Sequence, residues 1–364
     1  MSKTILITGA GGFVGHHFLE HVLATTNWNV VATDSFRHKG RTDRISQVLD
    51  AQPEYLNHPG YNGPTKRWKS RTKVITHDLC APFTPQQVRD LQATGIDYIA
   101  AFASESHVDR SIHDPVPFLR NNMEITYTTL ELARKLRPQS IIWVSTDEVY
   151  GPVEASDLKG HPEWDAILPS NPYSASKAAQ EATCISYWRT YGLPIVIVNC
   201  MNMIGERQDI EKYIPMVISK VHANEEVTIH GTPGNIGTRH YLHARNLADA
   251  MCFIFQRKQT PALFHSHVPS YDVHSADRLD RYNIASPDRI DNLTLAQMIA
   301  EDIGKPLKYK LEDFHSTRPG HDPHYGLDPS KLMNLGWSLP VPFRESLHKT
   351  VKWTLEHPDW LLPD

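Results

Sequence analysis

A glycine-rich turn between a strand and a helix limits the fold of this chain more than any other feature. The β-branched run Thr4–Thr8 is followed by Gly9-Ala10-Gly11-Gly12-Phe13-Val14-Gly15 and then by a helical pattern over His16–Thr25. In a Gly-x-x-Gly-x-x-Gly turn the glycines allow tight turning and close backbone approach, and the amino end of the helix faces a pyrophosphate. The turn therefore predicts a dinucleotide site formed by Gly9, Gly12, Phe13, Val14 and Gly15.

Apolar strands alternate with helical patterns through the first two hundred residues. Further strands are expected at 29–34, 73–79, 97–103, 141–145 and 193–199, with helices over 121–135 and 174–181. This alternation predicts an α/β fold with a Rossmann-type, doubly wound parallel sheet.

After Asn202 short elements and loops dominate, with a possible hairpin around 230–234, a loop-rich run over 265–291, and helices at 294–303 and 344–357. We expect a Rossmann domain over residues 1–202, to which the chain returns around 237–268. Residues 203–364 are expected to form mainly a smaller α/β substrate-binding domain.

The cofactor is predicted to be NAD. Asp34 ends the second strand about twenty residues after the glycine turn, where a carboxylate accepts hydrogen bonds from the adenosine ribose. That carboxylate would repel the 2′-phosphate of NADP, although Arg37 and Arg41 nearby keep NADP as an alternative. Asp78, at the end of the third strand, is placed to meet the adenine edge.

Acid-base residues follow the strand at 141–145. This strand leads into Thr146, Asp147 and Glu148, and in an open α/β sheet ligands bind at the carboxyl ends of strands. Tyr173 and Lys177 are four residues apart on one helix face, so the ammonium is expected to lower the pKa of the phenol. Taken alone, these residues could be a solvated turn and an exposed helix pair. Their convergence favours an active site.

Composition argues against nucleic acid and membranes as partners. The 364 residues carry a formal net charge of −4 and 40% hydrophobic side chains, as is typical of a soluble globular protein. No apolar run reaches the roughly 20 residues that a membrane span needs. Residues 66–73 group cations around Trp68, which could contact nucleic acid, but a solvated insertion over 36–71 is the preferred interpretation.

The cysteine and histidine spacing predicts no metal. The four cysteines form no Cys-x-x-Cys pair, which disfavours zinc and disulfides and favours a cytoplasmic location. Two short histidine pairs lack a nearby cysteine or a clear third ligand. These residues are Cys80, Cys184, Cys200 and Cys252, and the pairs His265-x-His267 and His321-x-x-His324.

Five motifs together resemble the extended short-chain dehydrogenase/reductase family of NAD-dependent epimerases and dehydratases. The closest resemblance is to its nucleotide-sugar 4,6-dehydratases, typified by dTDP-glucose 4,6-dehydratase. The glycine turn and Tyr173-x-x-x-Lys177 mark the superfamily, and three other segments mark the dehydratase branch. These segments are Ser104-Glu105-Ser106-His107-Val108-Asp109-Arg110-Ser111-Ile112, Ser145-Thr146-Asp147-Glu148-Val149-Tyr150-Gly151 and Arg318-Pro319-Gly320-His321-Asp322.

The resemblance implies a lyase that removes water from dTDP-glucose or UDP-glucose in deoxysugar biosynthesis. Tyr173, aided by Lys177 and Thr146, would take the 4-hydroxyl proton while NAD accepts the hydride. Glu148 would then remove the C5 proton, and Asp147 would donate a proton to the leaving 6-hydroxyl. Two alternatives remain: an epimerase or decarboxylase of the same fold, which does not need the two carboxyls, and a catalytically silent NAD-binding module.

The resemblance also implies contacts to the cofactor and substrate, and a homodimer. The further cofactor contacts are Leu79, Ala103, Tyr173, Lys177 and Asn199. The nucleotide-sugar contacts are Ser104, Glu105, Ser106, His107, Thr146, Asn202, Lys212, Arg239, Asn283, Arg318 and His321. Ile185, Tyr187 and Trp188 could form the dimer interface or pack against the chain's own sheet. Met203-Ile204 and His240-Tyr241 depart from the family pattern.

Overall fold

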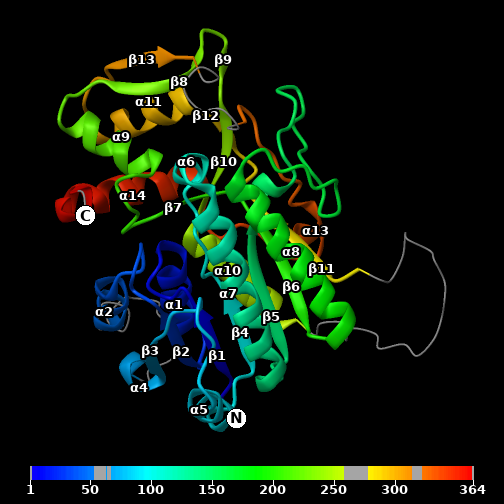
Figure 1. The fold of residues 1–364 in the computed structure, drawn as a ribbon. Helices are drawn as coiled ribbons and strands as arrows, with labels where there is room; N and C mark the ends of the chain where they lie inside the picture. Colours follow the sequence, from blue (N-terminus) through cyan, green and yellow to red (C-terminus); the bar gives the residue numbers. More distant parts are fainter. Residues whose placement is uncertain (1, 53–62, 64–66, 258–277, 314–321, 363–364) are drawn as a thin grey trace.

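A parallel sheet with helices on both faces forms the larger part of the molecule, and a smaller group of elements lies at one end of it (Figure 1). This computed structural model describes residues 2–52, 63, 67–257, 278–313 and 322–362.

The central sheet has seven strands in the order β11-β6-β5-β4-β1-β2-β3, and every pairing in it is parallel. Its β3-β2-β1-β4-β5-β6 order is that of a doubly wound sheet, which confirms the predicted fold class. The strands are β1 (Thr4–Thr8), β2 (Asn29–Asp34), β3 (Thr72–Thr76), β4 (Tyr98–Ala101), β5 (Ser140–Thr146), β6 (Ile195–Cys200) and β11 (Asp280–Ile284).

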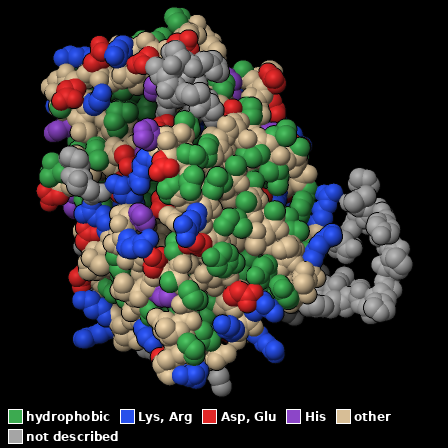
Figure 2. Space-filling model, viewed as in Figure 1, with side chains coloured by type: hydrophobic (Ala, Val, Ile, Leu, Met, Phe, Trp, Pro, Cys, Tyr) green, Lys and Arg blue, Asp and Glu red, His purple; other side chains and the backbone are tan. Residues whose placement is uncertain are grey.

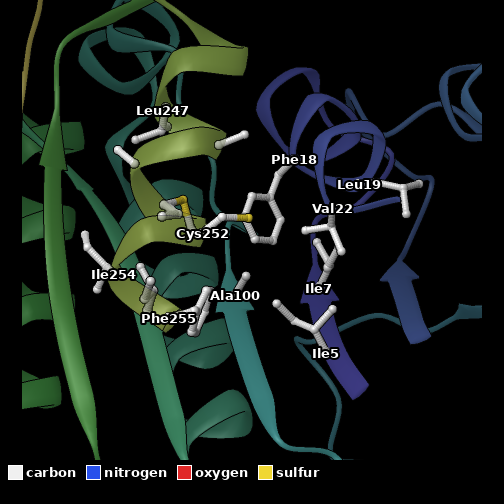
Figure 3. Packing of buried hydrophobic residues seen from close by; sticks show 14 of the residues in the cluster. Ile5, Ile7, Phe18, Leu19, Val22, Ala100, Leu247, Cys252, Ile254 and Phe255 are labelled. Atoms are coloured by element: carbon white, nitrogen blue, oxygen red, sulfur yellow. The ribbon is translucent and has the colours of Figure 1, made fainter. Parts of the chain in front are cut away.

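Alternate residues of these strands enter two separate hydrophobic clusters, because successive side chains point to opposite faces of a sheet. Ile5 and Ile7 pack with α1 and α10, whereas Leu6 packs in the cluster of α5, α7 and α8. Figure 3 shows the first cluster, in which Phe18 and Phe255 meet across the two helices. These helices are α1 (Phe13–Thr25), α10 (Ala244–Gln256), α5 (Pro85–Thr94), α7 (Pro115–Leu136) and α8 (Pro172–Tyr191).

Two parts of the chain are more ordered than the sequence predicts. The segment expected as a solvated insertion contains α2 (Thr42–Asp50) and α4 (Trp68–Arg71). Trp68 is fully buried and Arg71 donates to three backbone carbonyls, so this basic stretch is partly core. The described part of the run expected as loop-rich contains β11, which pairs with β6 and extends the sheet.

The smaller group has its own hydrophobic cluster, built on helices packed against short strands. The hairpin expected around residues 230–234 is present as β8 (Val227–Thr232) and β9 (Asn235–Ile236). The other elements of the smaller group are β7 (Asn202–Ile204), α9 (Tyr213–His222), β10 (Thr238–His243), β12 (Arg289–Asp291), α11 (Asn292–Ile303), β13 (Tyr309–Glu312), α14 (Phe343–Glu356) and η2 (Pro358–Leu361). The short helix α13 (Ser330–Asn334) instead packs on β11, and its Leu332 belongs to the cluster of the central sheet.

Candidate active site

A cavity of about 520 Å³ lies at the carboxyl ends of the sheet strands, between the sheet and the smaller group. Its wall runs from the glycine turn after β1, past the ends of β4 and β5, to α9 and β10. This is the edge of a doubly wound sheet at which ligands bind.

The glycine turn fits a dinucleotide pyrophosphate. Gly9 has a φ of +69°, and a Cβ atom on Gly15 would lie 2.1 Å from the Gly9 carbonyl oxygen, so both positions require glycine. Gly12 caps α1 without a side-chain hydrogen bond, and no acidic residue occupies the first helical turn of this fully described segment. The amino end of α1 therefore presents backbone N–H groups and a positive dipole to the cavity.

The loop after β2 is held by charged contacts at the predicted adenosine end. Asp34 accepts backbone N–H groups of Gly11 and Phe36, both at 2.9 Å, and lines the cavity. Arg37 pairs with Asp78 at 2.6 Å, and Arg41 pairs with Asp43. Arg37 and Arg41, the reason for retaining NADP as an alternative cofactor, thus already contact carboxylates.

Two further ion pairs connect this loop to the other walls of the cavity. His38 lies 3.3 Å from the carboxylate of Glu105, and Lys39 lies 3.7 Å from that of Glu211. Since all four residues line the cavity, the loop crosses from the cofactor end toward the smaller group.

The acid-base residues lie at the end of β5. Thr146 ends the strand, and Asp147 and Glu148 begin the short helix η1 (Asp147–Val149). The Thr146 hydroxyl donates to Asp147 Oδ1 at 2.9 Å, and Asn171 Nδ2 donates to Glu148 Oε2 at 3.2 Å. The two adjacent carboxyls therefore have different partners.

Burial raises the pKa of both carboxyls. For Asp147 the hydrogen bond from Thr146 and the charge of Arg239 oppose this rise in pKa. For Glu148 the neighbouring Asp147 raises the pKa further, whereas Asn171 and Arg239 lower it. Two coupled acids with raised pKa values can share one proton near neutral pH, which is the state that a paired acid and base require.

Tyr173 and Lys177 lie in the same cavity on α8, but their expected electrostatic relation is not found. Burial and the charge of Glu148 raise the pKa of Tyr173 well above its usual range. Lys177 Nζ donates to the Val144 carbonyl at 2.8 Å, and burial lowers the Lys177 pKa to about 8. The predicted lowering of the Tyr173 pKa by Lys177 is therefore wrong for this structure, because desolvation dominates.

A model of the NAD dependent epimerase/dehydratase family matches residues 5–265 of this chain. The match includes the glycine turn, the loop after β2 and the acid-base residues of the cavity. The chain belongs to this family.

Relatives within the family include dehydratases for two nucleotide sugars. The chain is 30% identical to dTDP-glucose 4,6-dehydratase 1 of Escherichia coli (strain K12), covering 98% of this chain and 94% of that protein. It is also 30% identical to the trifunctional UDP-glucose 4,6-dehydratase/UDP-4-keto-6-deoxy-D-glucose 3,5-epimerase/UDP-4-keto-L-rhamnose-reductase RHM1 of Arabidopsis thaliana, covering 98% of this chain and 48% of that protein.

A solved structure of similar shape is DesIV, a dTDP-glucose 4,6-dehydratase from Streptomyces venezuelae with NAD and TYD bound. It superposes with a TM-score of 0.77 at 26% identity, covering 98% of each chain. NAD is the cofactor of the family, and the glycine turn and Asp34 of this member have the geometry to hold it.

The cavity of this family member brings together most of the residues predicted from the sequence. Those that line it are Gly9, Gly12, Phe13, Val14, Gly15, Asp34, Asp78, Leu79, Ala103, Ser104, Glu105, Ser106, His107, Thr146, Asp147, Glu148, Tyr173, Lys177, Asn202, Lys212 and Arg239.

Two predicted contacts within the described part of the chain are not among the lining residues. Asn199 is fully buried behind the wall, where its amide donates to the Thr146 carbonyl and to Glu181. Asn283 is also fully buried and donates to the His161 carbonyl, so it lies in the packed interior and its substrate contact stays a prediction. Arg318 and His321 lie outside the described residues.

The structure also adds residues that sequence reasoning did not assign. Arg37, His38, Lys39, Met203, His230 and Tyr325 line the cavity, and Asn171 contacts Glu148. His240, one of the departures from the family pattern, points away and contacts the Ser286 carbonyl at 2.8 Å. Because these residues come from loops, from the short strands β7 and β8 and from the start of α8, only the fold reveals that they meet.

Among the described residues, no group of three or more His, Cys, Asp or Glu side chains is placed to hold a metal ion. His265, His267 and His321, from the two histidine pairs, lie outside the described part of the chain. His324 is buried, with its Nδ1 atom 2.9 Å from the Thr238 hydroxyl.

Proposed function

We propose that this protein is an NAD-dependent nucleotide-sugar 4,6-dehydratase, a hydro-lyase that converts dTDP-glucose or UDP-glucose into the 4-keto-6-deoxy sugar. One observation carries the proposal: Asp147, Glu148 and Tyr173 line the same cavity as the dinucleotide turn. A base for oxidation at C4, Tyr173, and an acid-base pair for elimination, Asp147 and Glu148, would thus face the same substrate sugar.

The first step removes hydrogen from C4 of the hexose. Tyr173 accepts the 4-hydroxyl proton; Thr146 is hydrogen-bonded to it, and Lys177 lines the same cavity. NAD, when bound, accepts the C4 hydride and later returns it to C6, and its positive ring favours the Tyr173 phenolate. The 4-ketone makes the C5 proton acidic, which prepares the sugar for elimination.

The second step removes water across C5 and C6. Glu148 takes the C5 proton, the C–H electron pair forms the C5–C6 double bond, and the C6–O bond breaks. When the proton shared by the pair lies on Asp147, this residue donates it to the leaving hydroxyl, so water departs. Burial of both carboxyls keeps one of them protonated near neutral pH.

The third step returns hydrogen to the sugar and restores the site. Glu148 gives its proton back to C5 as C6 is reduced. At this point Tyr173 holds one proton more than at the start and Asp147 one fewer. Proton transfer from Tyr173 to Asp147 completes the cycle, with no net redox change.

Cations at the smaller group suit the diphosphate of the substrate. Lys212 and Arg239 both line the cavity and are largely buried. The Arg239 guanidinium donates to the backbone carbonyls of Thr238, Asp322 and Pro323 and lies over the Tyr325 ring at 4.5 Å. These contacts fix the guanidinium as a charge near both the carboxyl pair and the proposed diphosphate site.

We further propose a homodimer that forms through α7 and α8. Figure 2 shows hydrophobic side chains gathered over the face where these helices lie, and Val116, Leu119, Tyr127 and Tyr191 are exposed there. Ile185, Tyr187 and Trp188 instead pack partly against the chain's own cluster. Light scattering should give twice the chain mass, and a monomer mass at micromolar concentration would reject the interface.

A cytoplasmic location completes the proposal. All four cysteines are free thiols, which suits a reducing compartment. No helix in the described residues is long and apolar enough to cross a membrane. Cell fractionation of the source organism would test this location.

The function is tested by incubating the NAD-loaded protein with dTDP-glucose and, separately, with UDP-glucose. We expect a product lighter by one water from at least one of them. The substrate that reacts faster identifies the preferred nucleobase, thymine or uracil. A product of unchanged mass but inverted C4 configuration would support an epimerase, and carbon dioxide release from a uronic acid sugar would support a decarboxylase. Bound NAD with no turnover of any nucleotide sugar would favour a silent module.

A further inference from the structure

Asn171 joins the two chemical halves of the cavity through one side chain. It is the N-cap of α8, the helix that carries Tyr173 and Lys177, and it is buried. Its Oδ1 atom accepts the Ser174 backbone N–H at 2.9 Å, which caps the helix. Its Nδ2 atom donates to Glu148 Oε2 at 3.2 Å.

The amide constrains how Glu148 can react. An amide nitrogen donates but does not accept, so Oε2 must be an unprotonated acceptor while this contact exists. Oε1 then remains as the oxygen that receives a proton. Because the same asparagine is locked to Ser174 by a reciprocal capping box, the donor cannot turn away without uncapping α8.

The charges around Glu148 show why such a donor matters. Asp147, Asp322, Tyr173 and Tyr325 lie close enough for negative charge on them to disfavour a charge on Glu148. The Arg239 and Lys212 cations and the Asn171 amide favour that charge. The partners come from η1, α8, β10, the start of α9 and the segment before α13. Of these partners, Asn171 is the one that donates a side-chain hydrogen bond to the carboxylate.

We propose that Asn171 is a positioning residue that holds Glu148 as the ionised base of the elimination step, with Oε1 aimed at the C5 proton. The inference rests on the proposed dehydratase function. It assigns Asn171 a role beyond helix capping and ties the elimination base to the helix that bears the oxidation base.

Three substitutions separate the capping role from the contact with Glu148. Asn171→Ser keeps a strong N-cap but is too short to donate to Glu148, and Asn171→Asp keeps the cap but places a carboxylate where the amide donates. Asn171→Ala removes both contacts. Each variant is compared with the wild type for water loss, pH profile, C5 deuterium isotope effect, reduced nicotinamide absorbance and thermal midpoint.

We expect Asn171→Ser to keep the wild-type thermal midpoint while kcat falls about 10- to 100-fold, the loss typical of one hydrogen bond to a charged group. The isotope effect should grow and reduced nicotinamide should accumulate, because elimination slows while C4 oxidation continues. In Asn171→Asp the acidic limb of the pH profile should move to higher pH, because a second carboxylate disfavours ionised Glu148.

Wild-type kcat, isotope effect and pH profile in Asn171→Ser would overturn the inference and leave Asn171 as a helix cap. A loss of activity confined to Asn171→Ala, in proportion to its lost stability, would overturn it equally. Absence of water loss in the wild type would overturn the dehydratase function itself and the inference with it, so the two failures are distinct.

Discussion

Asp147 and Glu148 are neighbours in sequence, but the turn that carries them gives them different surroundings. Asp147 is 4% exposed and receives the Thr146 hydroxyl, whereas Glu148 is more open and receives the Asn171 amide. This difference in partners suits the proposed division of the pair into an acid and a base, although both pKa values are raised.

The first prediction concerns these two carboxyls. Glu148→Gln should lower kcat by about 10²- to 10⁴-fold, as expected for loss of a general base, while hydride transfer from C4 continues. Stopped-flow absorbance of reduced nicotinamide should therefore show a stable rise in Glu148→Gln. Fast water loss in this variant, with no such rise, would exclude Glu148 as the base.

The second prediction concerns pH. An ordinary glutamate has a pKa of about 4.3. Because burial raises the pKa of both carboxyls, the acidic limb of the kcat profile should lie at a higher pH than that. Activity should fall as pH drops through the raised pKa, since the base becomes protonated. The acidic and basic limbs of the pH profile give apparent pKa values that belong to the Asp147–Glu148 pair as a whole. In Asp147→Asn the basic limb should change, and an unchanged profile would contradict a shared proton.

At the scale of single residues, the sequence predicts identities better than environments. Thr146, Asp147, Glu148, Tyr173 and Lys177 all line one cavity as their motifs indicate. Their electrostatics could not be read from spacing, because the Tyr173 pKa depends on burial and on Glu148 rather than on Lys177 four residues away. The sequence did not assign a role to Asn171 for the same reason, because its hydrogen bond to Glu148 joins α8 to η1.

At the scale of elements, a buried ion pair connects α8 to the last strand of the sheet. Arg281 on β11 donates to Glu181 on α8 at 2.6 Å, and both side chains are at most 1% exposed. Glu181 also accepts from Asn199, whose amide donates to the Thr146 carbonyl. The pair therefore supports the helix of Tyr173 and the turn of Asp147 together.

The third prediction tests this pair. Arg281→Met should destabilise the protein by about 3–5 kcal/mol, because it leaves the buried Glu181 charge without the guanidinium that neutralises it. Adding Glu181→Leu should recover part of that loss. Chemical denaturation of the single and double variants measures both effects. A double variant as unstable as the sum of the single changes would show that the two residues do not interact.

The elements themselves follow from the sequence where periodicity is strong. The six predicted strands of the sheet are present within a few residues of their expected bounds, and so are the helices α11 and α14. β11 and α2 were not predicted, because their polar residues hide the pattern and their burial comes from distant partners. Arg281 on β11 and Arg44 on α2 are both fully buried cations held by carbonyls and carboxylates.

At the scale of the whole molecule, a buried histidine group connects the cofactor helix to the smaller group. The rings of His16 and His17 on α1 are 4.1 Å apart, and His17 lies against His243, the N-cap of α10. Glu206, in the loop after β7, lies 3.2 Å from His243 Nε2. Burial lowers the pKa of all three histidines.

The fourth prediction follows from these lowered pKa values. The histidines are neutral in the folded protein but bind protons in the unfolded chain below pH about 6.5, so acidification favours unfolding. The free energy of unfolding should fall between pH about 7 and about 5, by up to about 1.4 kcal/mol per pH unit for each histidine. Depression of the Glu206 pKa adds to this loss only below its ordinary value.

Chemical denaturation at a fixed NAD concentration measures this pH dependence. His16→Gln should flatten the slope, and His113→Gln, at an exposed position, serves as the matched control. An equal free energy of unfolding at pH about 7 and about 5 would contradict the proposed effect of the buried histidines.

The global arrangement was predictable in outline, because a doubly wound sheet places its ligand at the carboxyl ends of the strands. The way that the smaller group closes the cavity was not predictable from the sequence. Lys39 and Glu211, which pair across it, come from segments with no periodic pattern. Such contacts depend on the path of loops, which local sequence does not determine.

In the proposed mechanism, one cofactor carries hydrogen from C4 to C6 of the same sugar. The most direct test uses dTDP-glucose or UDP-glucose deuterated at C4 and locates the label in the product by NMR. We predict that the dehydrated product carries the deuterium at C6. Recovery of the label at C4, or its loss to free reduced cofactor, would contradict this mechanism.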